Sequence, residues 1–417
     1  YYSCINVCFV ILFSRLACGG FGMSVSSWTG TAIDWERELS ALKVQLFSVF
    51  RRSEARETCS TFIDGLLSGI ERKTGWLMAE QAGFSRPWRI QALLGRSHWD
   101  AERMRDIVFD YVVETLGDPS GVLVVDETGF VKKGEHSVGV SRQYSGTAGR
   151  IENCQIGVFI SYASRFGQAL IDRRLYLPEA WATDEKRRKD ASVPDEAAFA
   201  TKPAMARAML SEALDKGVPC AWVLADAAYG SDYKTRRMLE ERQQPYVLSV
   251  RSNQTLRLLT DEGLLQTDPK EMADDLPDAA WQALPAGEGA KGLRLYDWAR
   301  ISLPYVVAPG FARYVLIRKS RSNPDAVSYY LVFAPAQATL ADLAGAAGLR
   351  WTIEECFQRA KDDLGLDHCE ARSWHGWHRH MTLVMAAAAF LTKLSADLRR
   401  SAFGKPNERS PNPSIAA

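Results

Sequence analysis

The feature that most constrains the fold is a pair of short apolar runs that each end in an aspartate. The runs are GVLVVD, residues 121–126, and CAWVLAD, residues 220–226. Continuous β-branched and aliphatic runs of this length predict strands buried on both faces, as in the centre of a parallel sheet. The carboxyl ends of such strands meet at the edge of the sheet where ligands bind. Asp126 and Asp226 are therefore either ligand-binding acids or caps of the following turn or helix, and their occurrence together favours binding.

A third acid lies on a segment with helical spacing, RWTIEECFQRAK, residues 350–361. On a helix, Arg350, Glu354 and Lys361 fall inside an arc of roughly 40°. An apolar stripe beside them can dock the helix against a core; it consists of Ile353, Phe357, Ala360 and Leu364. The segment thus predicts a docked helix whose second face carries a carboxylate between two cations.

Three carboxylates without soft ligands suit a hard divalent ion, Mg²⁺ or Mn²⁺. Two such ions about 4 Å apart can activate an attacking oxygen and stabilise a leaving one in a phosphoryl displacement. The residues therefore point to hydrolysis or transfer of a phosphodiester.

Composition adds broad limits. A chain of 417 residues with 47% hydrophobic and 24% charged residues is long enough for two or three globular domains. The net charge of +1 neither supports nor excludes a polyanionic partner, because basic segments recur at 185–189, 234–237, 313–322 and 372–380. The eight cysteines are scattered without zinc spacing, which indicates a reducing compartment and no structural zinc.

The chain divides by texture into helical and strand-rich parts. Residues 34–116 are predicted to be helical, and within them 76–94 have the spacing of a helix-turn-helix or of an ordinary helical hairpin. Strands are expected at 154–164 and 169–178, a helix at 203–216, further strands over 246–335 with a hairpin turning at 323–325, and helices over 340–399.

The two ends are expected to lie outside the fold. The apolar run 7–13 is too short to span a bilayer and lacks the preceding positive charge of a signal peptide. We interpret residues 1–22 as translated upstream sequence, with Met23 as the natural start. The Pro- and Ser-rich tail, 403–417, is expected to be disordered.

Three segments carry a family resemblance. Residues 124–161 (VVDETGFVKKGEHSVGVSRQYSGTAGRIENCQIGVFIS), 224–230 (LADAAYG) and 350–374 (RWTIEECFQRAKDDLGLDHCEARSW) resemble the DDE transposases of bacterial insertion sequences, in the branch with a β-rich insertion. The similarity spans about residues 47–391. It implies a ribonuclease-H-like α/β core and an enzyme that cuts and rejoins DNA at transposon ends.

The resemblance assigns roles to individual residues. Asp126, Asp226 and Glu354 match the three catalytic acids, which would hold two Mg²⁺ or Mn²⁺ ions. Arg350 and Lys361 fit the family's helix signature and would meet DNA phosphates. Ala347 stands where the signature has tyrosine, so the resemblance carries over no tyrosine role in gripping the DNA end or forming a hairpin intermediate.

The resemblance also orders the chain into domains. We expect a helical DNA-binding domain at 23–118, the first part of the ribonuclease-H-like core at 119–240, a β-rich insertion at 241–338, and the core completion with the glutamate helix at 339–402. The implied partners are the terminal inverted repeats and target DNA, bound by a dimer of a cytoplasmic protein that is nucleoid-associated when on DNA.

Further DNA-binding candidates follow the first aspartate and the third acid. The glycine-rich segment after Asp126 is either a loop that contacts DNA or a solvated hairpin; it contains Lys132, Lys133, His136, Arg142 and Gln143. Arg379, in WHGWHRH at 374–380, belongs either to a phosphate and base platform or to a packed aromatic loop. Trp281 and Trp298 are candidates for stacking on a flipped base or for core packing.

Two neighbouring acids are weaker candidates for the site. Glu127 adjoins Asp126 on a strand and should point to the opposite face, and Glu355 is turned by about 100° from Glu354 on the helix. The alternatives to a transposase are a host-adopted nuclease or DNA-binding regulator on the same fold, and a metal-independent carboxylate-pair hydrolase acting on sugars.

Overall fold

The computed structural model describes residues 32–403, except for 262, 290–291 and 324. The expectations for residues 1–22 and for the tail beyond Phe403 lie outside the described residues.

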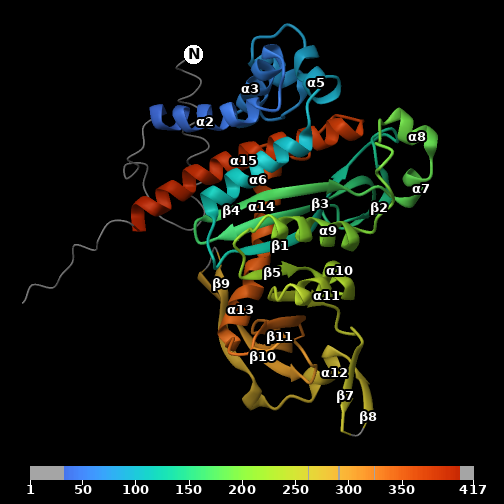
Figure 1. Ribbon diagram of the computed structural model, residues 1–417, viewed down its shortest axis with the longest axis vertical. Coiled ribbons are helices and arrows are strands. Elements are labelled where there is room, and N and C mark those ends of the chain that lie inside the picture. The colour runs from blue at the N-terminus through green and yellow to red at the C-terminus, as the bar shows by residue number, and fades with distance from the viewer. Residues whose placement is uncertain (1–31, 262, 290–291, 324, 404–417) are drawn as a thin grey trace, which may run out of the picture.

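The N-terminal part is helical, as predicted. It contains α2 (Ala32–Phe47), α3 (Ser53–Leu67), α4 (Gly75–Gln81), α5 (Trp88–Gly95) and α6 (Ala101–Leu116), and α2 to α5 lie above the rest of the molecule in Figure 1. α6 begins where the Asp100 carboxylate accepts hydrogen bonds from the N–H groups of Glu102 and Arg103. α4 and α5 are joined through Gly83, whose φ of 73° favours glycine. Two short helices thus occur where the sequence predicts a helical pair, and DNA binding by this pair stays a prediction.

A single mixed sheet runs through the molecule. Its strand order is β2-β3-β1-β5-β6-β12-β11-β10-β9, with β4 paired to β3. The strands on the side of the first aspartate are β1 (Val122–Val131), β2 (Ser141–Ser145), β3 (Arg150–Ser164), β4 (Gly167–Leu175), β5 (Trp222–Ala225) and β6 (Tyr246–Val250). The α/β class predicted from the sequence is confirmed.

Parallel and antiparallel pairing meet at β1. β1 pairs with β5 in parallel and with β3 antiparallel, and β5 pairs with β6 in parallel. The parallel pairing of β1 stops at Val125, but the antiparallel pairing with β3 continues to Val131. The expectation that the strand ends at Asp126 is therefore wrong, because β3 supplies hydrogen-bond partners for five more residues.

The segment expected to form a β-rich insertion continues this sheet. β12 (Val327–Pro335) pairs with β6, and β11 (Phe311–Ser320), β10 (Gly292–Leu303) and β9 (Gln282–Gly289) follow. β6 itself falls inside the segment 241–338 although it pairs with the core strand β5. A hairpin of β7 (Leu256–Thr260) and β8 (Gly263–Thr267) forms a separate sheet below α12 (Pro269–Asp274) in Figure 1. The boundaries of the four domains stay predictions.

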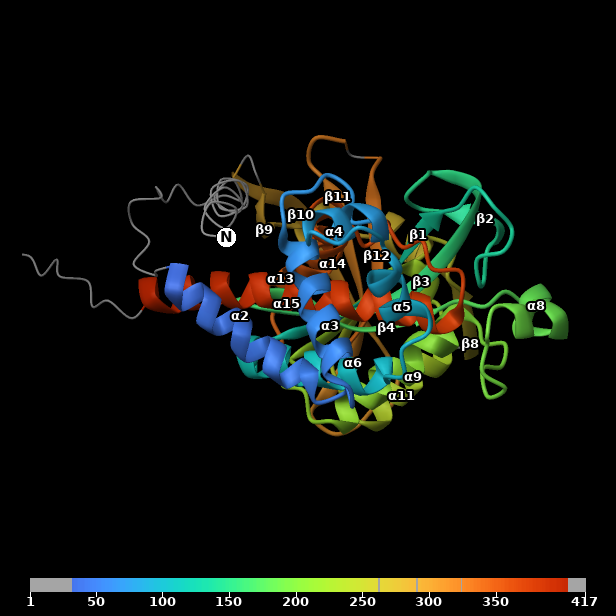
Figure 2. The same ribbon diagram turned by 90° about the horizontal axis from the view of Figure 1, so that it is seen from above.

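Helices cover both faces of the sheet near β1. On one face, α6, α14 (Thr352–Asp362) and α15 (Trp374–Phe403) contact β1, β3 or β4, and the long α15 lies alongside α6 (Figures 1 and 2). On the other face, α9 (Lys202–Asp215) contacts β3, and α10 (Ala227–Gly230) and α11 (Tyr233–Glu241) pack beside it. α7 (Glu179–Ala182) and α8 (Glu185–Asp190) form a small lobe beyond β2, and α13 (Leu340–Gly348) contacts β9.

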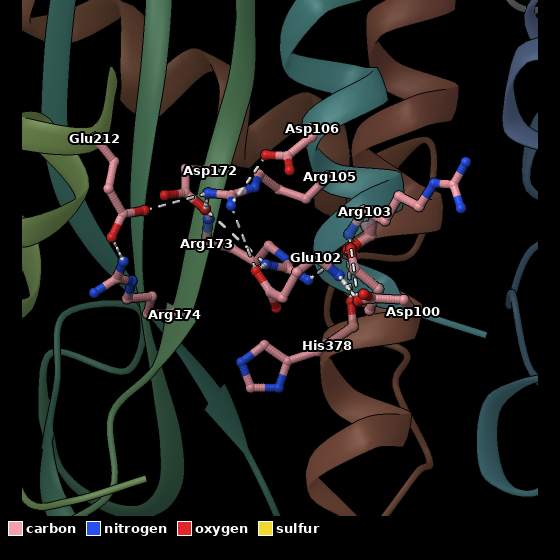
Figure 3. Close-up of polar contacts among 12 residues, drawn as sticks. Asp100, Glu102, Arg103, Arg105, Asp106, Asp172, Arg173, Arg174, Glu212 and His378 are labelled. Carbon is pink, nitrogen blue, oxygen red and sulfur yellow. Dashed lines mark hydrogen bonds and ion pairs between the residues drawn. The ribbon is translucent and has the colours of Figure 1, made fainter. Parts of the chain in front are cut away.

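A group of ionisable side chains, among which Asp172, Arg173 and His378 are buried, joins α6, β4, α9 and α15. The Arg105 guanidinium lies 2.9 Å from the Asp172 carboxylate, and Arg173 donates to Glu102 at 2.9 Å. Figure 3 shows how these side chains converge between the strands and the helices. We call this group the rear charge network; it consists of Glu102, Arg105, Asp172, Arg173, Glu212 and His378.

No helix within the described part of the chain is long and apolar enough to cross a membrane.

Candidate active site

Asp126 and Asp226 lie side by side at the point where parallel pairing ends. Val125 and Ala225 are the last paired residues of β1 and β5, so the two aspartates follow directly on adjacent strands. Asp226 also caps α10, because its Oδ1 accepts hydrogen bonds from the N–H groups of Ala228 at 2.9 Å and Tyr229 at 3.4 Å. Asp226 therefore caps α10 and also lies beside Asp126, so the two interpretations of this residue are compatible.

Gly230 brings α10 close to the end of β6. A Cβ atom at Gly230 would lie 2.0 Å from the backbone oxygen of Ser249. Only glycine permits this approach, because the obstacle is backbone and cannot rotate away. The short helix that Asp226 caps is thus held against the sheet.

The two aspartates are buried close enough to interact electrostatically. Burial, followed by the negative charge of Asp226, raises the pKa of Asp126 to about 7, although the N–H of Glu127 and the Arg350 guanidinium oppose the rise. Burial also raises the pKa of Asp226, against the hydrogen bonds that it accepts in α10. Arg350 only partly offsets the negative charge of this pair of acids, and a bound cation would offset the rest.

Arg350 connects Asp126 to Glu354. It lies in the 3₁₀ turn η3 (Leu349–Trp351) that precedes α14. Its guanidinium donates to Glu354 Oε1 at 2.8 Å and lies 3.6 Å from Asp126 Oδ2. The helix with the third acid is therefore linked to β1 through an arginine.

Lys361 forms a second link between α14 and β1. Its Nζ donates to Thr128 Oγ1 at 2.7 Å and to Thr147 Oγ1 at 3.0 Å. Thr128 is two residues from Asp126 and so faces the same side of β1, whereas Thr147 belongs to the turn between β2 and β3. Burial lowers the pKa of Lys361. The charged face of α14 thus lies along the Asp126 face of β1.

The carboxylate oxygens of Asp126, Asp226 and Glu354 are the kind of ligands that a hard divalent ion prefers. In the structure, the Arg350 guanidinium contacts two of these carboxylates, those of Asp126 and Glu354. Among residues 32–403, leaving aside the undescribed positions, no three His, Cys, Asp or Glu side chains are grouped to hold a metal ion. Asp126 and Asp226 offer oxygen ligands at the ends of adjacent paired strands. The raised pKa of Asp126 indicates that its negative charge is not fully balanced by nearby cations. Glu354 is engaged by Arg350 and would join them after that ion pair opens.

The predicted DNA-binding residues after Asp126 fall into two groups. Lys133, His136 and Arg142 are exposed. Lys132 is half-buried and donates to the backbone oxygen of Cys369 at 2.6 Å, while Gln143 donates to the backbone oxygen of Cys154. The side chains of the first group are open to a ligand, and those of the second hydrogen-bond to backbone within the fold.

Arg379 is placed differently from the expectation. Its side chain is 7% exposed and donates to the backbone oxygens of Leu94 and Trp99, so it ties α15 to the N-terminal helices. The segment 374–380 is the start of α15 and not a loop. The structure corrects the interpretation of Arg379 as a phosphate-binding residue, because its donors are used inside the fold.

Trp298 is also part of the core. It is fully buried, stacks on Tyr330 and donates to the backbone oxygen of Leu284. Trp281 is half-buried under the ammonium group of Lys319. Trp298 is therefore a core residue, which is the alternative to its stacking on a flipped base. Ala347, in the family's tyrosine position, is buried on α13.

Sequence reasoning missed the partners of these residues. The Lys361 ammonium group donates hydrogen bonds to the hydroxyl oxygens of Thr128 and Thr147. The Glu127 carboxylate accepts hydrogen bonds from Tyr229 and Lys202. Thr128 could have been found from its period-two spacing to Asp126. Lys202 gave no signal, because its position depends on how α9 packs on the sheet.

Comparisons with known proteins agree with the sequence resemblance. Residues 45–272 match the family model described as DDE superfamily endonuclease, and residues 201–391 match the one described as transposase DDE domain. A probable transposase for insertion sequence element IS701 of Microchaete diplosiphon is 25% identical over 304 residues, which cover 72% of this chain and 73% of that protein.

Among solved structures, the NurA nuclease from Sulfolobus solfataricus aligns with 62% of this chain and 85% of that chain. The sequence identity is 10% and the TM-score is 0.29, so this likeness carries no argument about the fold.

Proposed function

This chain belongs to the DDE superfamily endonucleases, as a DDE-type insertion-sequence transposase, and we propose that it cuts transposon ends and joins them to target DNA. The reaction would be a phosphodiester hydrolysis that frees a 3′-hydroxyl, followed by transesterification in which that hydroxyl attacks the target strand. We also propose that the mixed strands β4, β3, β1, β5 and β6 form a ribonuclease-H-like core.

One observation carries the proposal. Asp126 and Asp226 follow the last paired residues of adjacent parallel strands, and their proximity together with burial raises the pKa of Asp126 to about 7. Acids held together in this unfavourable way are characteristic of sites that bind a cation or transfer protons. The family match supports the assignment of phosphodiester chemistry to this pair.

We propose that Asp126, Asp226 and Glu354 hold two divalent ions, Mg²⁺ or Mn²⁺. Bound ions of this kind activate the attacking oxygen and stabilise the leaving oxygen of a phosphodiester. Arg350 would release Glu354 and turn toward a DNA phosphate, since the same guanidinium can bind a carboxylate or a phosphate. Lys361 would keep α14 aligned along β1 and meet a phosphate from its position beside Thr147.

DNA would approach over the segment after β1 and the hairpin of β2 and β3. Lys133, His136 and Arg142 are exposed there, and the lysine and the arginine supply positive charge. Because two transposon ends must be joined in one event, we propose that the protein acts as a dimer on DNA.

A strand-cleavage assay tests the proposal. The substrate is a duplex that carries the terminal inverted repeat and its flanking DNA, incubated with the full chain and Mg²⁺ or Mn²⁺. Asp126→Asn, Asp226→Asn and Glu354→Gln should each slow cleavage by at least about 10³-fold, because each removes a charged metal ligand. Binding to the uncut repeat, measured by gel shift, should change little.

Glu355 provides the matched control. It adjoins Glu354, but its Oε2 accepts a hydrogen bond from Gln168 at 2.6 Å and points away from Asp126 and Arg350. Glu355→Gln should cleave within about threefold of the wild type. Full cleavage by Asp126→Asn, or equal losses in Glu354→Gln and Glu355→Gln, would refute the assignment.

A further inference from the structure

Glu127 occupies a junction beside the two aspartates. It follows Asp126 on β1 and extends toward the opposite face of the sheet, where α9 and α10 pack. Its Oε2 accepts the hydroxyl hydrogen of Tyr229 at 2.6 Å, and its Oε1 accepts from the ammonium group of Lys202 at 2.5 Å. The carboxylate is therefore engaged at both oxygens.

The contact with Tyr229 leads directly to Asp226. Tyr229 is 2% exposed and belongs to α10, the short helix that Asp226 caps. The backbone N–H of Tyr229 donates to Asp226, and its side-chain hydroxyl donates to Glu127. One residue thus binds the second aspartate through its backbone and the neighbour of the first aspartate through its side chain.

Lys202 adds a third element to the junction. It is the first residue of α9, and its ammonium group also lies 5.6 Å from the centre of the Tyr176 ring. Glu127 therefore joins β1 to both α9 and α10, whereas backbone pairing alone joins β1 to β5 only as far as Val125 and Ala225.

We infer that Glu127 is a positioning residue: held by Tyr229 and Lys202, it fixes the separation of the Asp126 and Asp226 carboxylates and so the geometry in which they bind metal. The inference rests on the proposed function. Beyond the last paired residues, no sheet hydrogen bond between β1 and β5 controls that separation. The Glu127–Tyr229 hydrogen bond crosses the same gap from the other side.

The chemistry of the side chain supports this role. A third carboxylate near Asp126 and Asp226 adds like-charge repulsion, which a glutamine would avoid. Tyr229 and Lys202, however, donate to different oxygens of Glu127, and a glutamine in the same place would turn its NH₂ group, which only donates, toward one of these two donors. Position 127 thus carries a glutamate, which can accept from both donors, although its charge is unfavourable beside Asp126 and Asp226. This is expected if both contacts are needed.

Calorimetric titration with Mn²⁺ in the absence of DNA tests the inference without an activity measurement. Glu127→Ala should weaken Mn²⁺ binding about 10-fold, in the range for residues that orient metal ligands. Tyr229→Phe removes only the hydroxyl, and Glu127→Gln keeps an acceptor for it, so each should weaken binding by a smaller factor, about threefold. Glu127→Ala combined with Tyr229→Phe should bind no more weakly than Glu127→Ala alone, because both changes break one connection.

Glu152→Gln is the matched control, since Glu152 is a half-buried acid on β3 that pairs with Arg150 and has no contact with Tyr229 or Lys202 among the described residues. Its Mn²⁺ affinity should equal that of the wild type. All titrations are run well below the thermal midpoint of each variant, and if Glu127→Ala does not fold, Tyr229→Phe and Glu127→Gln carry the test. Affinities within twofold of the wild type in the folded variants, with or without a lower thermal midpoint, would overturn the inference.

Asp126→Asn separates this inference from the proposed function. If Asp126→Asn loses Mn²⁺ binding and cleavage while Glu127→Ala keeps both, only the positioning role fails. If Asp126→Asn keeps both, the assignment of the site itself fails.

Discussion

Two clusters of ionisable side chains lie on the central sheet, and their acids are paired differently. In the rear charge network every acid has an arginine within ion-pair distance (Figure 3). Burial acts to raise the pKa of Glu102, but Arg173 outweighs it and lowers the pKa to about 2. Burial lowers the pKa of His378 to about 3, so that this histidine is neutral beside Arg173.

At the edge with Asp126 and Asp226, acids face one another. Burial and the charge of Asp226 raise the pKa of Asp126 to about 7, and Arg350 lies 3.6 Å away and is shared with Glu354. The fold is therefore able to pair a buried acid, Asp172, with arginines, and it does so away from the edge that carries Asp126 and Asp226. The shortage of positive charge is therefore a property of the edge with Asp126 and Asp226 and does not reflect how the fold packs charges in general.

The largest expected effect is the loss of a charge from the rear network. Arg105→Met leaves Asp172, whose side chain is 5% exposed, without its ion pair at 2.9 Å. The free energy of unfolding, measured by denaturant titration, should fall by about 3–5 kcal/mol. Burial already raises the pKa of Asp172 against the opposition of Arg105 and Arg173, so the remaining carboxyl should bind a proton in the variant.

The double variant Arg105→Met with Asp172→Asn is the control, because it removes both charges. It should recover most of the lost stability. A single variant as stable as the wild type would show that the rear network does not depend on charge pairing.

The pH dependence of stability should differ between the two clusters. Asp126 keeps its proton in the folded protein up to about pH 7, whereas its unfolded value is 3.8. Without divalent ions, the free energy of unfolding should therefore fall as the pH rises from about 4 to about 7, by up to about 4 kcal/mol. The pKa of Glu102 is lowered, so its contribution is present above its unfolded value of 4.5 and is lost as the pH falls toward 2.

Asp126→Asn should abolish the part of this pH dependence near neutrality and leave the acid part unchanged. Mg²⁺ should raise the free energy of unfolding of the wild type at pH 8, and so reduce its fall near neutrality, because the ion binds the ionised Asp126 and Asp226 of the folded protein. If the free energy of unfolding of Asp126→Asn still falls as the pH rises toward 7, another group causes that pH dependence.

A smaller effect is expected for the arginine that joins the site to α14. Arg350→Met removes the contacts with Asp126 and Glu354. Without divalent ions it should lower the free energy of unfolding by about 1–2 kcal/mol at pH 8, and by less at pH 5, where Asp126 is protonated. Denaturant titrations at the two pH values measure the difference; an equal loss at both would mean that Asp126 is not a partner.

The smallest effect is expected at the surface. Arg237 and Glu241 form an ion pair on α11 with side chains that are 74% and 62% exposed. Solvent screens this pair, so Arg237→Ala should leave the denaturant midpoint unchanged within error. A clear shift would show that ion pairs stabilise this protein regardless of burial, which would remove the contrast between the two clusters.

The sequence predicted the elements and the faces that carry the site. The apolar runs before Asp126 and Asp226 are strands, because their composition favours a buried strand. Glu354 and Lys361 lie on α14 as predicted, whereas Arg350 lies in the 3₁₀ turn before it; Arg350 and Lys361 contact β1. The roles of the three acids remain predictions that the cleavage assay tests.

What the sequence did not predict depends on contacts between distant segments. Arg379 has the composition of a DNA-binding residue, but its acceptors, Leu94 and Trp99, come from segments more than 270 residues away. β1 extends past Asp126 because β3 provides a partner, and no local pattern within residues 126–131 carries that information. Charge and period therefore predict candidates, and tertiary burial decides which of them are free to bind.

The order of the elements along the chain has a consequence for synthesis on the ribosome. Phe159 of β3 packs against Phe357 of α14 at 5.4 Å and against Trp377 of α15 at 6.3 Å, between ring centres. Both helices are translated after all the strands, so the emerging polypeptide carries an uncovered aromatic surface until its last segment leaves the exit tunnel. A premature stop codon after β12 would leave that surface permanently open and the product prone to aggregate.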